Sequence, residues 1–303
     1  MGLMDGKVAI VTGAGQGIGR AIAEGLAASG ARVVVNDIGV SLSGRTENAA
    51  IAGEVVAAIE AAGGEALANA ESIAEWDGAS RLVEAAHERF GRLDLVVNNA
   101  GILRDAIFHK LEPAEWQAVL DVHLTGSFNV SRAAAPAMRR QESGAFVFMT
   151  STAGLIGNYG QANYMAAKMG LVGLMRSVAM DMQRFGVRAN CIAPFAWSRM
   201  ISSMPAETEA EKARVAKLQK MTPDKIAPLV AFLGSDAARD VSGQIFTVRN
   251  NEIFLMSQPM PIRSMHRADG WTPETIAELL PGAMGPSFSP LQRSTDVFSW
   301  DPI

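Results

Sequence analysis

Tyr164 and Lys168 stand four residues apart, a spacing that places both side chains on one face of a helix. A phenol titrates near pH ~10, so its use as a base near neutrality requires a pKa lower by roughly 3 units, or about 4 kcal/mol. An adjacent ammonium favours the phenolate, and we expect Lys168 to supply much of that shift. Ser151 lies upstream, where its hydroxyl could position a substrate oxygen by a hydrogen bond. These residue types predict proton transfer to or from an oxygen of a substrate.

A glycine-rich segment near the N-terminus, Thr12–Gly19, lies between an apolar run and a helix-length segment. Glycines let the backbone turn tightly and approach a pyrophosphate, whose charge is stabilised by the helix N-terminus. We therefore expect this segment to bind a dinucleotide through Gly13, Gln16, Gly17, Ile18 and Gly19.

Asp37 ends the next apolar run, about 20 residues after the glycines. An acidic side chain at this position can accept hydrogen bonds from an adenosine ribose, and its carboxylate repels a 2′-phosphate. The sequence therefore predicts NAD rather than NADP as the cofactor. The alternative interpretation is that Asp37 is an ordinary turn residue at the end of a strand.

Short β-branched runs alternate with longer alanine-rich segments, which implies a parallel sheet with helices on both faces. We expect an α/β fold with a doubly wound, parallel, seven-stranded dinucleotide-binding sheet, helices on both faces, a helical lid and a C-terminal extension. The clearest strand-sized runs are residues 8–11, 32–35, 95–97, 145–149, 188–192 and 245–248, and the helix-length segments are 17–29, 48–62, 76–90, 113–139 and 163–185.

Two regions interrupt the alternation. Residues 198–221 form an amphipathic segment that no strand directly follows, and we interpret it as a lid over the carboxyl ends of the strands. Its cations could meet the phosphates of coenzyme A or form a solvated helical face; they are Lys212, Arg214, Lys217 and Lys220. We expect a catalytic domain over residues 1–257 and an extension over residues 258–303, with one clear helix that begins at Thr272 and Pro273.

The composition excludes several classes of protein. With 303 residues, 49% of them hydrophobic, the chain can bury a large core and is too apolar for intrinsic disorder. Its 27 basic and 31 acidic residues create no cationic field for nucleic acid or for an anionic membrane. Residues 143–167 carry no charge, but their glycines and asparagines would be costly in a bilayer. The single cysteine, Cys191, cannot form an internal disulfide, and the scattered histidines predict no metal site. We expect a cytoplasmic protein that contacts no nucleic acid and no membrane.

Four motifs in order make the sequence resemble the short-chain dehydrogenase/reductase family over about residues 5–250. They are the TGxxxGxG spacing from Thr12, the NNAG run at residues 98–101, Ser151, and the YxxxK pair of Tyr164 and Lys168. The resemblance implies catalytic roles for Ser151, Tyr164 and Lys168 and a homo-oligomer, either a dimer or a tetramer. It also implies cofactor contacts for Ser72, Ile73, Asn99, Ala100, Gly101, Tyr164, Lys168 and Pro194.

His123 departs from the pattern of that family, which usually has an asparagine in a stretch similar to VNLTG where this chain reads VHLTG. An imidazole can also pass a proton or hold a water molecule, so His123 is a fourth candidate catalytic residue. The alternative is a buried histidine with satisfied hydrogen bonds, and the sequence does not separate the two.

Local segments are most similar to the 3-hydroxyacyl-CoA dehydrogenase part of peroxisomal multifunctional enzyme type 2 and to its bacterial single-domain relatives. These segments are residues 98–105, 122–128, 157–164 and 192–200. Two segments depart from the wider family. Phe195 follows Pro194 where glycine is usual, and Ser72 and Ile73 stand where Asp-Val often holds the adenine. Both departures leave the substrate open.

The resemblance therefore implies hydride transfer between NAD and a bulky secondary alcohol or ketone, foremost a 3-hydroxyacyl-CoA. One alternative is a hydroxysteroid dehydrogenase of the 17-beta type. A second alternative, from another class, is a non-catalytic protein that senses NADH. The presence of Ser151, Tyr164 and Lys168 argues against a sensor, which has no need of them.

Overall fold

The computed structural model describes residues 2–39, 50–196 and 208–303. Its centre is a single sheet in the order β3-β2-β1-β4-β5-β6-β7-β8, in which β1 to β7 pair in parallel. The order reverses between β1 and β4, which is the switch point where open α/β sheets bind their ligands. The strands are β1 Val8–Thr12, β2 Arg32–Asn36, β3 Glu65–Asn69, β4 Leu95–Asn98, β5 Gly144–Met149, β6 Val187–Phe195, β7 Ile245–Arg249 and β8 Glu252–Leu255.

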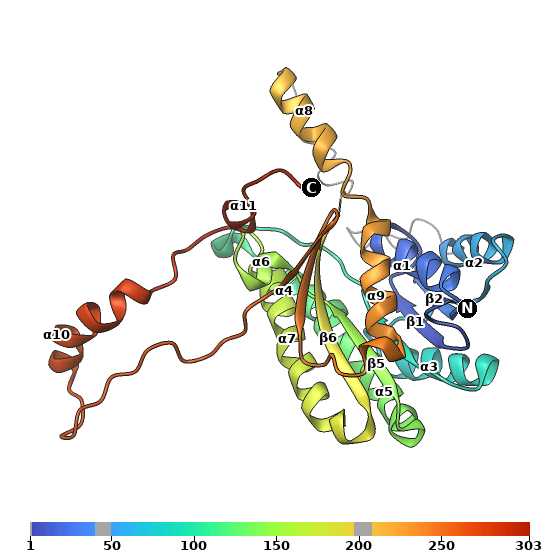
Figure 1. Ribbon diagram of the computed structural model, residues 1–303, viewed down its shortest axis with the longest axis horizontal. Helices are drawn as coiled ribbons and strands as arrows, with labels where there is room; N and C mark the ends of the chain where they lie inside the picture. Colours follow the sequence, from blue (N-terminus) through green and yellow to red (C-terminus); the bar gives the residue numbers. More distant parts are fainter. Residues whose placement is uncertain (1, 40–49, 197–207) are drawn as a thin grey trace.

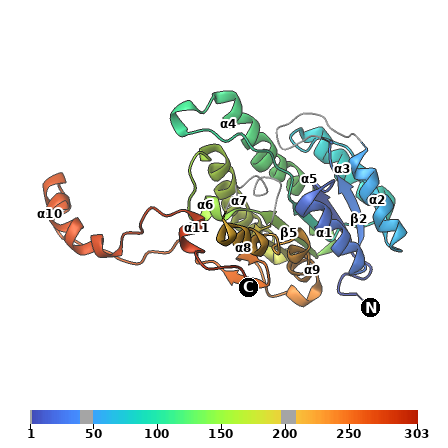
Figure 2. The same cartoon turned by 90° about the horizontal axis from the view of Figure 1, so that it is seen from above.

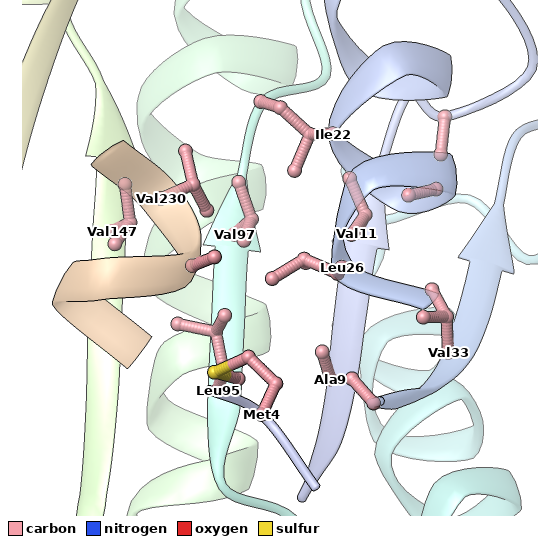
Figure 3. Close-up of a cluster of buried hydrophobic side chains, with 14 of the residues drawn as sticks. Met4, Ala9, Val11, Ile22, Leu26, Val33, Leu95, Val97, Val147 and Val230 are labelled. Atoms are coloured by element: carbon pink, nitrogen blue, oxygen red, sulfur yellow. The ribbon is translucent and has the colours of Figure 1, made fainter. Parts of the chain in front are cut away.

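Helices cover both faces of the sheet, as Figures 1 and 2 show. Alternate residues of each strand point to opposite faces, so the buried side chains form two cores. The first core contains Ala9 and Val11 of β1 and lies against α1, α2 and α9, while the second contains Val8 and Ile10 and lies against α3, α5 and α7. Figure 3 shows part of the first core, where Ile22 and Leu26 of α1 meet side chains from three neighbouring strands. The longer helices of the body are α1 Gly17–Ala28, α2 Ile51–Ala61, α3 Trp76–Phe90, α4 Pro113–Leu120, α5 Gly126–Gln141, α7 Ala162–Met182 and α9 Ala227–Gly234.

The expected doubly wound α/β fold is confirmed, but the strand count of seven is wrong, because the described part of the chain forms eight strands. The additional strand, β8, pairs antiparallel with β7. A tight turn joins the two strands, and Asn250 adopts a left-handed conformation there with φ +54°. The alternation of strand and helix stops at Arg249, so the sequence pattern did not predict β8.

The segment predicted as one helix over residues 113–139 has three parts. Helix α4 passes into a π-helical turn, Asp121–Thr125, which continues directly into α5. Such single π turns occur frequently at functional sites, and this one carries His123. Gly30, Gly63, Gly91 and Gly186 each follow a helical segment and have positive φ values, as left-handed glycine caps do.

The segment after β8 leaves the body as an arm. None of residues 257–293 is buried, and Figure 1 shows α10, Pro273–Met284, well away from the sheet. The predicted helix start is confirmed, because the Thr272 hydroxyl accepts a hydrogen bond from the Thr275 amide. The chain then returns, and the short helix α11, Ser294–Val297, lies beside α6, Thr152–Leu155, near the carboxyl edge of the sheet (Figures 1 and 2). Within the described parts of the chain, no helix combines the length and apolarity that a membrane crossing requires.

Candidate active site

The residues predicted to do chemistry converge at the carboxyl ends of the central strands. The glycine loop follows β1, Asp37 follows β2, Asn99 follows β4, Ser151 follows β5 and Pro194 lies at the end of β6. Parallel strands all end at the same edge of the sheet, which is why motifs spread over 180 residues of sequence meet there.

The glycine loop is packed so closely that side chains would not fit. A Cβ on Gly13 would lie 2.7 Å from the Ala100 Cα, and one on Gly19 would lie 2.2 Å from the Gly13 carbonyl oxygen. Gly13 and Gly17 also have left-handed backbone conformations, with φ values of +63° and +57°. The loop therefore presents backbone at the start of α1, where amide donors and the helix dipole suit a pyrophosphate.

Asp37 lies against this loop. Its carboxylate accepts hydrogen bonds from the amides of Gly15, at 2.9 Å, and Gly39, at 2.8 Å. A Cβ on Gly15 would lie 2.9 Å from the same carboxylate, so Gly15 lets the two strand ends approach. The carboxylate is thus held beside the cradle, at the position from which it can accept ribose hydroxyl donors.

The run after β4 is joined to β1 through Thr12. The Thr12 hydroxyl accepts from the amides of Asn99, at 3.0 Å, and Ala100, at 3.1 Å. The Asn99 side chain in turn donates to the carbonyls of Thr12 and Gly13. These bonds hold Asn99, Ala100 and Gly101 beside the glycine loop. The sequence motifs did not predict that Thr12 joins this run to the loop.

Ser72 and Ile73 lie in the loop between β3 and α3. Asn129 of α5 donates to the Ile73 carbonyl at 3.0 Å, and a Cβ on Gly78 would lie 2.2 Å from the Ser72 carbonyl oxygen. Ile73 is buried against α5. The backbone of this loop is therefore held in place by contacts with α3 and α5.

Ser151, Tyr164 and Lys168 form one cluster. The Lys168 ammonium is buried, donates to the Met149 carbonyl at 2.6 Å and lies 5.5 Å from the centre of the Tyr164 ring. Ser151 caps α6 and hydrogen-bonds the Tyr164 phenol, which lowers the pKa of that phenol. Tyr164 and Lys168 thus share one face of α7, as their spacing predicts. Ser151, which follows β5, lies beside them.

The expectation that Lys168 lowers the phenol pKa is wrong for the chain by itself. Burial raises the pKa of Tyr164, Ser151 partly offsets that rise, and the charge of Asp105 adds to it. Burial also lowers the pKa of Lys168 to about 7, so its own charged form is disfavoured. Both groups lose hydration in one apolar pocket, and burial is the largest cause of the shift in each pKa.

His123 lies behind the cluster, in the π turn. Its ring packs edge-on against Tyr164 with centroids 5.4 Å apart, and a Cβ on Gly101 would lie 2.2 Å from its Cε1. Its Nε2 lies 2.8 Å from the Ile102 carbonyl oxygen, while Nδ1 has no partner among the described residues. Burial, followed by the charge of Lys168, lowers the pKa of His123 to about 3, so the imidazole is neutral.

A polar chain on the approach to Tyr164 was missed in the sequence. Asn158 donates to Gln161 at 2.8 Å, and Gln161 donates to the Asp105 carboxylate at 2.9 Å. Asn163 donates to the Arg104 carbonyl and accepts from the Tyr164 amide. Asp105 ends the segment that starts at Asn98. An acidic residue so close to the NNAG motif was the feature of the sequence from which this polar chain could have been predicted.

The predicted lid is only partly described, since residues 198–207 lie outside the described residues. Its helix is α8, Glu209–Leu218, which rises from the carboxyl edge in Figure 1. Lys212 pairs with Glu209 at 2.8 Å, and Lys217 pairs with Asp301 at 2.6 Å. Both pairs are exposed. The first lies within α8 and is a contact expected of a solvated helical face, whereas the second joins α8 to the C-terminal segment.

The backbone cradle, the nearby carboxylate and the Tyr164 cluster fit a dinucleotide, because the glycine loop, which has no room for a Cβ at Gly13, Gly15 or Gly19, presents its backbone at the start of α1. Within residues 2–39, 50–196 and 208–303, no group of three His, Cys, Asp or Glu side chains is arranged to hold a metal ion.

The chain is similar to known proteins over most of its length. The short chain dehydrogenase family model matches residues 7–209. A short-chain type dehydrogenase/reductase of Mycobacterium tuberculosis is 44% identical, covering 82% of this chain and 83% of its own. A hydroxyacyl-CoA dehydrogenase of the same species is 40% identical, with coverage of 91% and 88%.

The likeness extends to a larger protein and to a solved structure. Peroxisomal multifunctional enzyme type 2 of Mus musculus is 41% identical over 80% of this chain, which spans 32% of that protein. The crystal structure of a short chain dehydrogenase from Mycobacterium avium superposes with a TM-score of 0.83 at 39% identity, covering 96% of this chain and 99% of that one. The resemblance stated from the motifs is therefore confirmed: this chain belongs to the short-chain dehydrogenase/reductase family of oxidoreductases, whose fold implies a nicotinamide dinucleotide cofactor.

Proposed function

We propose that the protein transfers a hydride between NAD and a bulky secondary alcohol or ketone, and that its substrate is a 3-hydroxyacyl-CoA. The observation that carries the proposal is the cluster of Ser151, Tyr164 and Lys168 beside a backbone cradle with Asp37 at its ribose end. We assign residues 1–257 to the catalytic domain, with residues 198–221 as its lid, and residues 258–303 to the extension.

The choice of NAD rests on Asp37. Its carboxylate is already oriented by the amides of Gly15 and Gly39. The 2′- and 3′-hydroxyls of an NAD ribose offer donors to it, whereas the 2′-phosphate of NADP would bring like charge to the same place. We infer that the same pocket uses Ser72 and Ile73 for the adenine.

The bound nicotinamide supplies the hydride acceptor or donor and, when oxidised, a positive charge. Tyr164 takes the proton of the substrate hydroxyl during oxidation, and Ser151 holds the substrate oxygen beside the phenol. Lys168 and Asn99 to Gly101 hold the nicotinamide half of the cofactor, with Pro194 closing its far side. Burial raises the pKa of Tyr164 in the chain alone, and the positive charge of an oxidised nicotinamide nearby would lower it.

The substrate class is supported by two similar proteins, a hydroxyacyl-CoA dehydrogenase and a peroxisomal multifunctional enzyme, at 40% and 41% identity. It is supported further by the aromatic residues Phe195, Phe254 and Phe298, which gather at the end of β6. Such a surface suits a long apolar group better than a small alcohol.

The test is NADH or NADPH formation, followed by absorbance, over panels of 3-hydroxyacyl-CoA thioesters, hydroxysteroids and small secondary alcohols. We expect the highest kcat/KM with a 3-hydroxyacyl-CoA and NAD. A clear preference for hydroxysteroids would favour the 17-beta type instead. Tight NADH binding without turnover of any panel member would indicate a sensor.

A further inference from the structure

The last twelve residues of the chain contact four segments at the carboxyl edge of the sheet. After the exposed arm, residues 292–303, here called the C-terminal wall, return to the carboxyl edge of the sheet (Figures 1 and 2). This return makes four sets of contacts, which involve the loop at Gly157, the end of β6, the turn between β7 and β8, and α8.

The first contact is with the loop that links Ser151 to Tyr164. Ser294 donates its amide to the Gly157 carbonyl at 3.0 Å, and its hydroxyl lies 3.4 Å from the same oxygen. A Cβ on Gly157 would lie 2.5 Å from the Gln292 carbonyl oxygen, so two backbones pack directly against each other. The wall therefore touches the polypeptide between two catalytic residues.

The second contact is aromatic. Phe298 is 8% exposed and packs edge-on against Phe195, with ring centroids 5.0 Å apart, and against Phe254 at 5.3 Å. Phe195 follows Pro194 directly and is the last residue of β6. Phe298 thus fixes the point at which the chain leaves the sheet beside the nicotinamide position.

The third contact explains a buried cation that the reaction does not use. Arg249 is 4% exposed, donates to Glu252 at 3.0 Å and to the Trp300 carbonyl, and lies 5.2 Å from the centre of the Trp300 ring. The Trp300 indole donates to the same Glu252 at 2.8 Å, and the Asn251 amide donates to the Ile303 carbonyl. A buried charge needs such a set of partners, so this is a built anchor for the chain end.

The fourth contact reaches the predicted lid, through the ion pair of Lys217 on α8 with Asp301. We propose that the C-terminal wall is the specificity element of this enzyme: it braces the Gly157 loop, the end of β6 and α8, and it thereby sets which apolar groups of the substrate are accepted. This inference rests on the proposed function for the identity of the substrate, but the bracing itself does not.

The test compares Trp300→Ala with Trp271→Ala, because Trp271 lies on the exposed arm and serves as a matched control. Short- and long-chain 3-hydroxyacyl-CoA thioesters are assayed at saturating NAD. We expect Trp300→Ala to lower kcat/KM for the long chain by about tenfold, mainly through KM, and to leave the short chain within about threefold. NADH affinity should stay within about twofold, because none of the four sets of contacts described above involves the glycine loop or Asp37. An unchanged ratio between long and short chains would overturn the specificity role.

Phe298→Leu, with Phe288→Leu on the arm as its control, covers the case in which Trp300→Ala fails to fold. A leucine keeps an apolar contact with Phe195 and Phe254, so we expect a smaller change in the same direction. If both wall variants match their controls, the proposal is wrong.

Hydrogen exchange measured by mass spectrometry separates this proposal from the proposed function. We expect Trp300→Ala, but not Trp271→Ala, to speed amide exchange in the Gly157 loop and in α8, whatever the substrate is. If the wild type turns over no thioester, the proposed function fails, and the exchange data alone decide whether the wall braces the site. Equal exchange in the two variants would refute the bracing.

Discussion

The cofactor side and the substrate side of the site are built in different ways. On the cofactor side, the Asp37 carboxylate accepts from the Gly15 amide and the Asn99 side chain donates to the Gly13 carbonyl, and all four residues lie within the first 101 residues. On the substrate side, Phe195 and Phe254 meet Phe298, which is distant in sequence, through ring contacts and without a shared motif.

This difference has a chemical origin. A pyrophosphate and a ribose demand donors and acceptors at fixed positions, so only particular residues, above all glycines, satisfy them. An apolar group demands only volume and removal from water, which a distant segment supplies equally well. The first kind of site leaves motifs in the sequence, and the second kind does not.

The largest effect should come from Tyr164→Phe, at the boundary between the two sides. We expect turnover to fall by about a thousandfold, because the proton acceptor is lost, while NADH affinity stays within about twofold. Steady-state kinetics and NADH fluorescence measure the two quantities. Turnover within about tenfold of wild type would show that another group acts as the base.

Gly19→Ala tests the cofactor side. Its Cβ would lie 2.2 Å from the Gly13 carbonyl oxygen, so we expect NADH affinity to fall by about a hundredfold. Gly53→Ala on α2 is the matched control, since a Cβ there meets no atom within 4 Å. Fluorescence titration of both variants checks the prediction, and equal affinities would mean that the glycine loop can accommodate a side chain at position 19.

Asp37→Ala tests the preference of the cofactor side for NAD over NADP. We expect the preference for NAD over NADP to shrink by about tenfold or more, because charged hydrogen bonds to the ribose contribute about 1.5 to 3 kcal/mol and the repulsion of a phosphate also disappears. The ratio of kcat/KM for the two cofactors measures this preference. A wild-type enzyme that favours NADP would contradict the role of Asp37 at once.

The smallest change in activity should follow His123→Asn, where the two sides meet. We expect activity within about tenfold of wild type, because the imidazole is neutral and bonded to the Ile102 backbone. A much greater loss would mean that His123 takes part in the proton transfer itself.

The same variant has a pH signature in stability. A folded-state pKa of about 3, against 6.5 for the unfolded chain, means that the unfolded state binds the extra proton below about pH 6.5. As pH falls from 7 to 5, the free energy of unfolding of the wild type therefore decreases by about 2 kcal/mol because of this group. The His123→Asn variant should lack this contribution. Urea unfolding at both pH values measures the difference, and parallel losses would contradict the buried neutral imidazole.

The sequence by itself determined the α/β class, the glycine cradle, Asp37 and the Ser151, Tyr164 and Lys168 cluster, because each depends on residue type at short spacing. The tertiary structure alone decided the eighth strand, the π turn at His123, the raised pKa of Tyr164 and the return of the C-terminal wall. Burial, charge environment and contact between Phe195 and Phe298 arise only when distant segments pack together. No local pattern records them, because packing constrains the volume and polarity of side chains far more than their order along the chain.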